Sequence, residues 1–272
     1  MRIESLTSFS NEKIKFAISL KEKREREQSG LIFVEGFREI SRLAQNKNFA
    51  VQSIFFCEEF FLGGNEMDLI QSFSLKTVFS VSTPVFRKLS FRDRPDGIIA
   101  IAKPPSLEIP KEGFRNFSEK SSFVLVVEGV EKPGNLGTIL RTADGAKVDA
   151  VFVADSKTDV WNPNVIRAST GIVFTLPIFS GAIQEIISVL QGFQFQILSI
   201  TPEAKKNLYE TDLKGKTALV FGSEQYGLSA FAKEHASELV SLPMLGVADS
   251  LNLAQCASVC IYEAIRQRNY AK

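Results

Sequence analysis

The sequence predicts an α/β protein of two domains, in which the C-terminal domain is built on a parallel sheet. Its 272 residues are enough for two domains of ordinary size. Short apolar runs alternate with amphipathic segments along the chain, which is the pattern of α/β folds. A proline-containing stretch with little periodic hydrophobicity interrupts this alternation, so we expect domains at 1–104 and 122–272 and a linker at 105–121.

The smaller N-terminal domain is predicted to alternate strands with helices. It begins with one charged helix over 11–28, which Gly30 ends. A later helix is expected to have Thr83 as its N-cap and Pro84 at its first position. Runs rich in β-branched and aromatic residues predict strands at 31–34, 51–57, 76–81 and 97–102. The remaining helices are predicted at 35–45 and 65–73.

The C-terminal domain opens with the near-continuous apolar run 123–127, which is typical of a buried parallel strand. Further strands are predicted at 150–154, within 171–179, and at 195–200, 217–221 and 239–242. Helices are predicted at 136–146, 163–169, 183–190 and 251–268. This alternation predicts a parallel sheet that is covered on both faces.

Composition excludes several classes of protein. A hydrophobic content of 44% and a charged content of 23% are those of a soluble globular protein. There is no apolar run long enough to span a bilayer and no signal-peptide pattern, so we expect a cytoplasmic protein without a membrane partner. Three cysteines without metal-like spacing, and a single His235 in a charged stretch, argue against a metal site and against a Ser-His-Asp triad.

Net charge does not indicate nucleic-acid binding by itself. The whole chain carries +1, and residues 1–120 carry 19 Lys and Arg against 16 Asp and Glu. Any RNA-binding surface must therefore be a local patch. The basic segments 21–26 and 87–94 are the candidates, although the interleaved glutamates of the first favour an ordinary solvated helix face.

Three blocks that mix glycines with polar residues lie at strand ends, namely 132–143, 221–229 and 242–252. The carboxyl ends of neighbouring parallel strands are where such folds bind ligands. Gly222 ends one predicted strand and permits close backbone approach. The neighbouring strand ends contribute the candidates Ser199, Thr201, Leu242 and Met244. No Gly-x-Gly-x-x-Gly follows the first strand, which disfavours a dinucleotide-dependent oxidoreductase.

Together and in this order, the three blocks resemble the motifs of the SpoU/TrmH family in the SPOUT superfamily, over residues 122–272. The resemblance implies an S-adenosylmethionine-dependent enzyme that methylates the ribose 2′-hydroxyl of ribosomal RNA, or of transfer RNA. It also implies a deep trefoil knot and a homodimer with the site near the subunit interface. More loosely, Phe33 to Arg38 resembles the RNA-binding domain that many members carry, so Arg38 is a candidate RNA contact.

The resemblance assigns roles to individual residues. The matching catalytic set is Asn135, Arg141, Glu224, Ser250 and Asn252, and the backbone of Gly222, Leu242 and Leu251 matches cofactor-binding positions. A further block, 167–171, contributes Arg167 and Ser169 as candidate RNA or site-rim residues.

Some of these roles have alternatives in the residues themselves. Arg141 either activates the ribose hydroxyl or clamps a phosphate and stabilises developing negative charge, and a plain ion pair with Glu128 is the structural alternative. Asn135 and Ser250 are also good helix N-caps.

Two positions depart from the family pattern. Lys147 stands where a glycine is usual, and Gln225 replaces a small residue after the motif glutamate. The second departure concerns the substrate lip, and therefore the identity of the target. The alternative function is a catalytically inactive RNA-binding or ribosome-assembly factor on the same scaffold.

Overall fold

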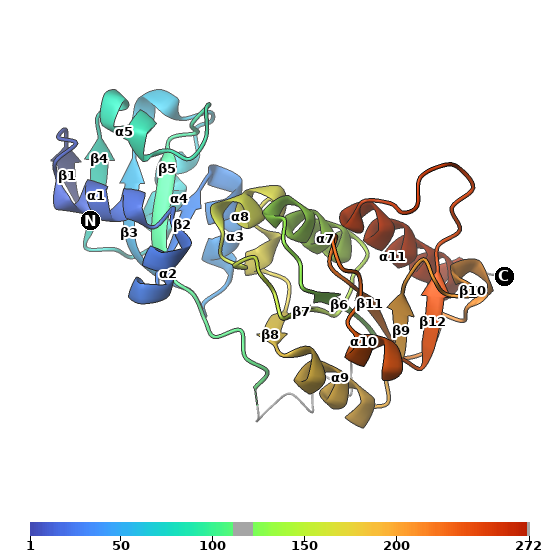
Figure 1. Cartoon of the computed structure of the whole chain (residues 1–272). Helices are drawn as coiled ribbons and strands as arrows, with labels where there is room; N and C mark the ends of the chain where they lie inside the picture. The colour runs from blue at the N-terminus through green and yellow to red at the C-terminus, as the bar shows by residue number, and fades with distance from the viewer. Residues whose placement is uncertain (111–121, 271–272) are drawn as a thin grey trace. The chain divides into compact units, whose positions relative to one another are not determined.

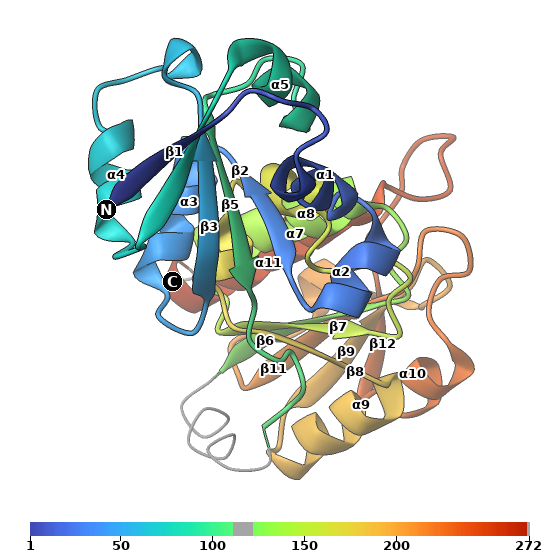
Figure 2. The same ribbon diagram turned by 90° about the vertical axis from the view of Figure 1, so that its left-hand side faces the viewer.

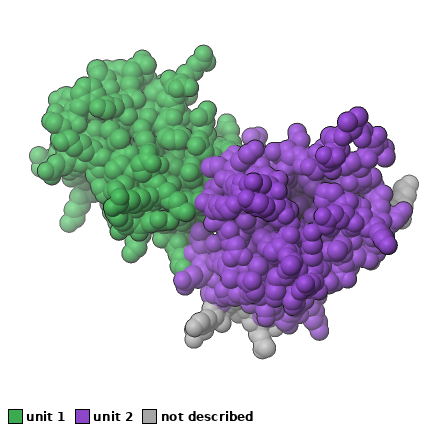
Figure 3. All heavy atoms as spheres, viewed as in Figure 1, with its two compact units in different colours: residues 1–106, 159–175 green, residues 107–158, 176–272 purple. Residues whose placement is uncertain are grey.

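The chain forms two compact units in the computed structural model, which describes residues 1–110 and 122–270 (Figure 3). Unit 1 contains residues 1–106 and 159–175, and unit 2 contains 107–158 and 176–272. The segment 159–175 thus packs with the first unit, whereas we expected it in the second domain. Most of the expected linker, 111–121, lies outside the described residues.

Unit 1 is built on a five-stranded sheet in the order β1-β4-β3-β5-β2. Strands β1, β4 and β3 run parallel, and β5 runs antiparallel to both β3 and β2. The strands are β1 (Arg2–Leu6), β2 (Ile32–Glu35), β3 (Ala50–Phe56), β4 (Thr77–Val81) and β5 (Ile98–Lys103). Of these, only β1 was absent from the predicted elements.

Helices lie on both faces of this sheet (Figure 2). On one face, α1 and α5 pack over a core that is rich in phenylalanine, and α3 and α4 lie on the other face. The helical elements are α1 (Glu12–Ser19), α2 (Lys23–Ser29), α3 (Phe37–Gln45), η1 (Glu58–Phe60), α4 (Glu66–Ser72) and α5 (Thr83–Leu89).

The single helix predicted over 11–28 is wrong, because the backbone of Glu22 is extended and divides it into α1 and α2. Arg26 stabilises this break, because its guanidinium turns inward and donates to the carbonyl oxygens of Leu20 and Lys21. It also pairs with Asp159 at 2.7 Å. This arginine is only 4% exposed, so the interpretation of this segment as an ordinary solvated face is also wrong at that position.

Helix ends agree in part with the predictions. Gly30 ends α2 in the left-handed conformation at φ +67°, as expected. In contrast, Ser82 is the N-cap of α5, and Thr83 is its first helical residue.

The segment 159–175 forms α8 (Pro163–Ala168) and η2 (Ile172–Phe174) within unit 1. Arg42 donates to the hydroxyl of Thr170 at 2.8 Å, and Asn46 donates to the carbonyl of Phe174 at 2.8 Å. Phe174 also packs edge-on against Phe49. These hydrogen bonds and ring contacts are what attach the segment to unit 1.

Unit 2 contains a seven-stranded sheet in the order β10-β12-β9-β11-β6-β7-β8, and every pairing is parallel. The predicted parallel sheet is therefore confirmed. Its strands are β6 (Phe123–Glu128), β7 (Ala150–Ala154), β8 (Ile178–Gly181), β9 (Gln196–Ile200), β10 (Lys206–Asn207), β11 (Thr217–Phe221) and β12 (Glu238–Ser241).

Helices cover both faces of the unit 2 sheet, as predicted (Figure 1). In this view α7 and α11 lie above the strands and pack against each other, and α9 and α10 lie below them. These helices are α7 (Pro133–Gly145), α9 (Ile183–Gly192), α10 (Ala230–Glu234) and α11 (Leu253–Asn269), and η3 (Leu208–Glu210) follows β10. Because β12, β9 and β11 are neighbours, their carboxyl ends meet at one edge of the sheet.

Candidate functional site

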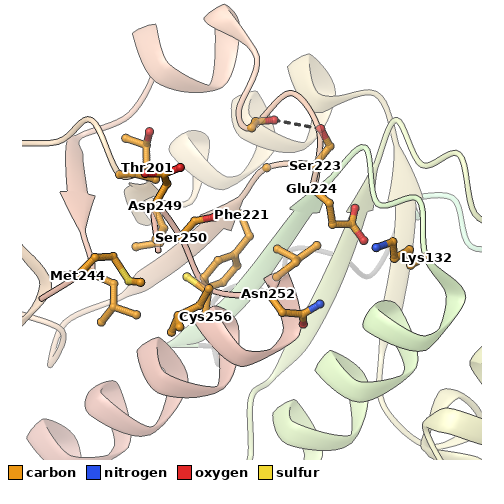
Figure 4. Close-up of a pocket in the computed structure, with 17 residues that line it drawn as sticks. Lys132, Thr201, Phe221, Ser223, Glu224, Met244, Asp249, Ser250, Asn252 and Cys256 are labelled. Carbon is orange, nitrogen blue, oxygen red and sulfur yellow. Dashed lines mark hydrogen bonds between the residues drawn. The ribbon is translucent and has the colours of Figure 1, made fainter. Parts of the chain in front are cut away.

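A cavity of about 440 Å³ opens at the carboxyl ends of β9, β11 and β12, beside the start of α11 (Figure 4). Eight residues that the sequence analysis had selected line it: Thr201, Gly222, Glu224, Leu242, Met244, Ser250, Leu251 and Asn252. The second and third glycine-containing blocks therefore meet in one place, together with the end of β9.

The cavity has an apolar part and a polar rim. Phe221, Ile200 and Leu253 are almost fully buried where they line it. The hydroxyls of Thr201 and Ser250 supply polar groups. A cavity of this volume, lined by apolar and polar groups in similar measure, is large enough for a small-molecule ligand that has both kinds of surface.

A chain of hydrogen bonds joins all three blocks. The side-chain amide of Asn135 donates to Glu224 Oε1 at 2.6 Å, and Asn252 donates to Asn135 Oδ1 at 3.2 Å. Asn252 is also the N-cap of α11, because its Oδ1 accepts from the backbone N–H of Ala254 at 2.9 Å. The bonds hold Glu224 in one orientation at the cavity wall.

These bonds correct two expectations about capping. Asn135 lies inside α7, whose N-cap is Lys132, so its amide is free for the contact with Glu224. Ser250 lines the cavity, and Asn252 is the N-cap of the last helix instead.

Glu224 is held as a carboxylate. Its partial burial would raise its pKa, but the hydrogen bond from Asn135 and backbone N–H donors, including that of Glu131, outweigh this effect, and the pKa lies below its usual value. Glu224 is thus ionised at neutral pH and accepts hydrogen bonds. In Figure 4 its carboxylate and the ammonium group of Lys132 point toward one another.

Gly222 is required by the loop that follows it. A Cβ at this position would lie 2.1 Å from the carbonyl carbon of Gly227 and 2.2 Å from the nitrogen of Leu228. The loop carrying Glu224 therefore packs directly on the Gly222 backbone, and any side chain there would displace it.

Arg141 is not among the residues that line this cavity. It is exposed on α7, six positions after Asn135, which turns it by about 120° around the helix and moves it about 9 Å along the axis. Its side chain has no hydrogen bond or ion pair within the described residues. The alternative of an ion pair with Glu128 is wrong, because no such pair forms within the described residues: Glu128 is only 6% exposed and accepts from the backbone N–H of Ser229 at 3.0 Å.

Ser199 is a further correction. It is fully buried on β9, and its hydroxyl donates to the carbonyl of Ala232 in α10 at 2.9 Å, so it does not line the cavity. Residues that sequence reasoning missed include Lys132, Phe221, Asp249 and Cys256. The first three lie within the recognised blocks or next to selected residues, so proximity was the available signal.

The three candidate RNA contacts lie in unit 1. Arg38 on α3 and Arg167 on α8 are exposed, as an RNA contact requires. Ser169 is fully buried, and its hydroxyl donates to the carbonyl of Ile166 at 3.0 Å. Its side chain is therefore not available to a ligand.

Two further residues from the sequence analysis, Lys147 and His235, lie outside the cavity. Lys147 adopts the left-handed conformation at φ +54°, where a glycine would be unstrained. His235 is exposed at the C-terminal end of α10. Across residues 1–110 and 122–270, no cluster of three or more His, Cys, Asp or Glu is suited to a metal ion, and no helix could cross a membrane.

Two protein-family models match the chain. The model of the SpoU rRNA methylase family matches residues 122–262, and that of the MRM3-like substrate binding domain matches residues 11–100. A 23S rRNA (guanosine-2′-O-)-methyltransferase of Pectobacterium atrosepticum is 39% identical over 54% of this chain. The alignment spans 60% of that relative's length.

Three other proteins are similar to this chain over nearly their whole length. An uncharacterised tRNA/rRNA methyltransferase of Synechocystis is 31% identical, over 98% of this chain and 95% of that one. A solved RNA 2′-O ribose methyltransferase is 35% identical, with a TM-score of 0.82, over 97% of this chain and 99% of that one. An AdoMet-bound rRNA methyltransferase of Sinorhizobium meliloti, 23% identical with a TM-score of 0.86 over 99% of both chains, shares the fold.

Proposed function

The chain belongs to the SpoU rRNA methylase family, and we propose that it transfers a methyl group from S-adenosylmethionine to a ribose 2′-hydroxyl of RNA. Ribosomal RNA is the preferred substrate in this proposal, and transfer RNA is the second choice. The observation that carries the proposal is the hydrogen-bonded set of Asn135, Glu224 and Asn252, which joins the three sequence blocks at one cavity.

The cavity suits S-adenosylmethionine by its size and lining. Its apolar part, which includes Phe221 and Leu253, would hold an adenine ring. We propose that the backbone of Gly222, Leu242, Met244 and Leu251 binds the base and ribose, and that Thr201 and Ser250 bind polar groups of the ligand. When bound, the sulfonium supplies an activated methyl group.

The residues of this chain then have to orient and stabilise the acceptor. In the proposed reaction the bond between the 2′-oxygen and the methyl carbon forms as the bond between sulfur and that carbon breaks, and the hydroxyl proton leaves to water. A guanidinium remains protonated at neutral pH, so we assign Arg141 to holding the adjacent phosphate and stabilising developing alkoxide charge. Its exposure and its freedom from partners within the described residues support this role.

We further propose that two copies of the chain form a homodimer with the site near the interface. Leu245 and Val247, on the segment that leads to α11, are 98% and 101% exposed, and Tyr262 on α11 is 54% exposed. Apolar side chains so placed favour burial against a partner. A dimer would also bring further residues, such as Arg141, toward a cavity that it does not line within its own chain.

Other parts of the proposal concern the whole chain. Residues 1–104 serve as the RNA-binding domain, supported by the family match to residues 11–100 and by the exposed Arg38. Arg167, which is also exposed and belongs to unit 1, is a further candidate RNA contact. The C-terminal part, 122–272, carries the deep trefoil knot of the SPOUT superfamily, supported by the packing of α11 against α7 and β11. A ribosomal RNA substrate would place the protein in the cytoplasm.

The assignment of Arg141 is tested by the variant Arg141→Ala. We expect methyl transfer to RNA to be lost while calorimetric binding of S-adenosylmethionine largely survives. Undiminished turnover would contradict the role of Arg141. The alternative function, an inactive RNA-binding or assembly factor, predicts that the wild-type protein does not bind S-adenosylmethionine at all.

A further inference from the structure

An exposed tyrosine and a lysine lie beside the cavity and have no part in the proposed methyl transfer. Tyr226 is 71% exposed, although it is only two residues from Glu224. Lys157 places its ammonium nitrogen 5.1 Å from the centre of the Tyr226 ring. The side chain of Lys157 is 59% exposed, so both groups are accessible to a ligand.

The backbone fixes Tyr226 in place. Ser223 and Gly227 exchange two backbone hydrogen bonds, at 3.0 and 3.1 Å, which closes the loop that carries the tyrosine. The N–H of Tyr226 also donates to the hydroxyl of Ser223 at 3.0 Å. This loop also packs on Gly222 and contains Glu224, which both line the cavity, so the backbone that carries the ring is well supported beside the cavity.

Lys157 is also held in position, and its ion-pair partner is hydrogen-bonded to Glu224. Its ammonium pairs with Glu131 at 2.5 Å, and the N–H of Glu131 donates to Glu224 Oε2 at 3.3 Å. The next residue, Thr158, donates its N–H to the carbonyl of Val130 at 3.2 Å. The cation and the ring are thus attached to the same framework as Glu224.

A rigid exposed ring beside an accessible cation is suited to an unpaired nucleotide. Proteins bind single-stranded nucleic acid by stacking bases on aromatic rings and by contacting phosphates with basic side chains. We propose that Tyr226 stacks on a base of the RNA next to the ribose to be methylated, and that Lys157 binds the phosphate of that nucleotide. This inference rests on the proposed function and identifies Tyr226 and Lys157 as substrate-positioning residues.

The first experiment measures methyl transfer to an in vitro transcript of 23S ribosomal RNA. We expect Tyr226→Ala to raise KM for the transcript roughly 5- to 160-fold, which corresponds to the loss of one stacked base. Tyr226→Phe keeps the ring and should behave as the wild type. Tyr209, which is 53% exposed and follows the sheet-edge strand β10, provides the matched control Tyr209→Ala.

Binding of S-adenosylmethionine separates this role from a structural one. All these variants should bind it with the affinity of the wild type, because Tyr226 and Lys157 do not line the cavity. An unchanged KM in Tyr226→Ala would overturn the inference. If light scattering also shows that Tyr226→Ala associates with itself more weakly than the wild type, the ring is a subunit contact and the inference is wrong.

A second experiment keeps the inference testable if the transcript is not methylated. If the wild type binds S-adenosylmethionine but does not methylate the transcript, this counts against the proposed substrate and not against the stacking site. Binding is then measured to a ten-nucleotide oligoadenylate and to an abasic strand of the same length. Tyr226→Ala should weaken binding to the oligoadenylate only, and equal affinities of variant and wild type would overturn the inference.

The phosphate contact is tested with the same two strands. Lys157→Ala should weaken binding to both, because each carries the same phosphates. It should also reduce the slope of log affinity against log salt by about 0.7, the value for one phosphate of a single strand. An unchanged slope would refute the role of Lys157.

Discussion

Substitution of Gly222 by alanine tests whether the loop after β11 sets the geometry of the site. The added Cβ would lie 2.1 Å from the carbonyl carbon of Gly227, and ordinary contacts begin at 3.4 Å, so the loop must retreat by about 1.3 Å. Backbone atoms, and not a flexible side-chain end, are what the Cβ meets. The retreat therefore moves the segment that carries Glu224.

Two consequences follow from this displacement. Overpacking of this kind costs about 1–3 kcal/mol, which should lower the melting temperature by roughly 2–10 °C. A misplacement of about 1 Å at a catalytic group reduces turnover on the order of 10²-fold. We expect the larger effect on methyl transfer, because the displaced loop includes Glu224 and borders the cavity.

The assay compares Gly222→Ala with Gly192→Ala, measuring melting temperature, binding of S-adenosylmethionine and methyl transfer to RNA. Gly192 lies in α9 and a Cβ there would meet nothing within 4 Å, so this control should melt at or slightly above the wild-type temperature and keep full activity. Wild-type activity in Gly222→Ala would refute the reasoning, because the loop would then tolerate the displacement.

Three further predictions concern single contacts. The hydrogen bond from Asn135 lowers the pKa of Glu224. The contact therefore stabilises the fold at pH values above the usual pKa of a carboxylate, and this stability is lost as the pH falls through the lowered pKa. Asn135→Ala should therefore raise the pKa of Glu224 in an NMR titration, and an unchanged value would contradict this. Cys256 lines the cavity, so saturating S-adenosylmethionine should slow its alkylation by iodoacetamide, and an unchanged rate would place the ligand elsewhere. At Gly36 (φ +120°) a Cβ would lie 2.2 Å from Glu39 Oε2 and 2.4 Å from Arg92 Nη2, and these two side chains are joined in an ion pair. Gly36→Ala should therefore lower the melting temperature more than Gly30→Ala (φ +67°), whose Cβ meets nothing within 4 Å, because it combines a less accessible φ with displacement of that pair. Equal losses would refute this reasoning.

Local sequence pattern was enough to predict most of the fold. The run 123–127 is apolar at every position because β6 lies inside a parallel sheet with helices on both faces. By contrast, β1 is a short edge strand with mostly exposed residues, and it lacks such a run. Edge strands of this kind leave a weak signal, since few of their side chains enter a core.

Long-range contacts explain where the predictions failed. Arg26 is buried because Asp159 lies beside it, 133 positions away in the chain, and no local rule identifies that partner. Long-range contacts also explain why residues 159–175 belong to unit 1. Hydrogen bonds such as that from Arg42 to Thr170 attach the segment to this unit, and local sequence pattern does not show them.

In the candidate site, too, some residues could be predicted from local pattern, and others depend on contacts that the pattern does not show. Residues at strand ends, such as Gly222 and Thr201, were predictable because parallel strands end at a common edge. Ser199 was not excluded, because the strand pattern does not show that its hydroxyl faces Ala232. The spacing from Asn135 gives the rotation of Arg141 about α7, but it does not show on which side of that helix the cavity lies.

The most direct test of the central claim is chemical mapping of the methylated product. Purified protein is incubated with S-adenosylmethionine carrying a labelled methyl group and with 23S ribosomal RNA transcript, and the digested nucleosides are analysed by mass spectrometry. We predict label in a 2′-O-methylated nucleoside, and its loss with Arg141→Ala. Label on a base, or no label in the transcript, would contradict ribose methylation of 23S ribosomal RNA by this protein.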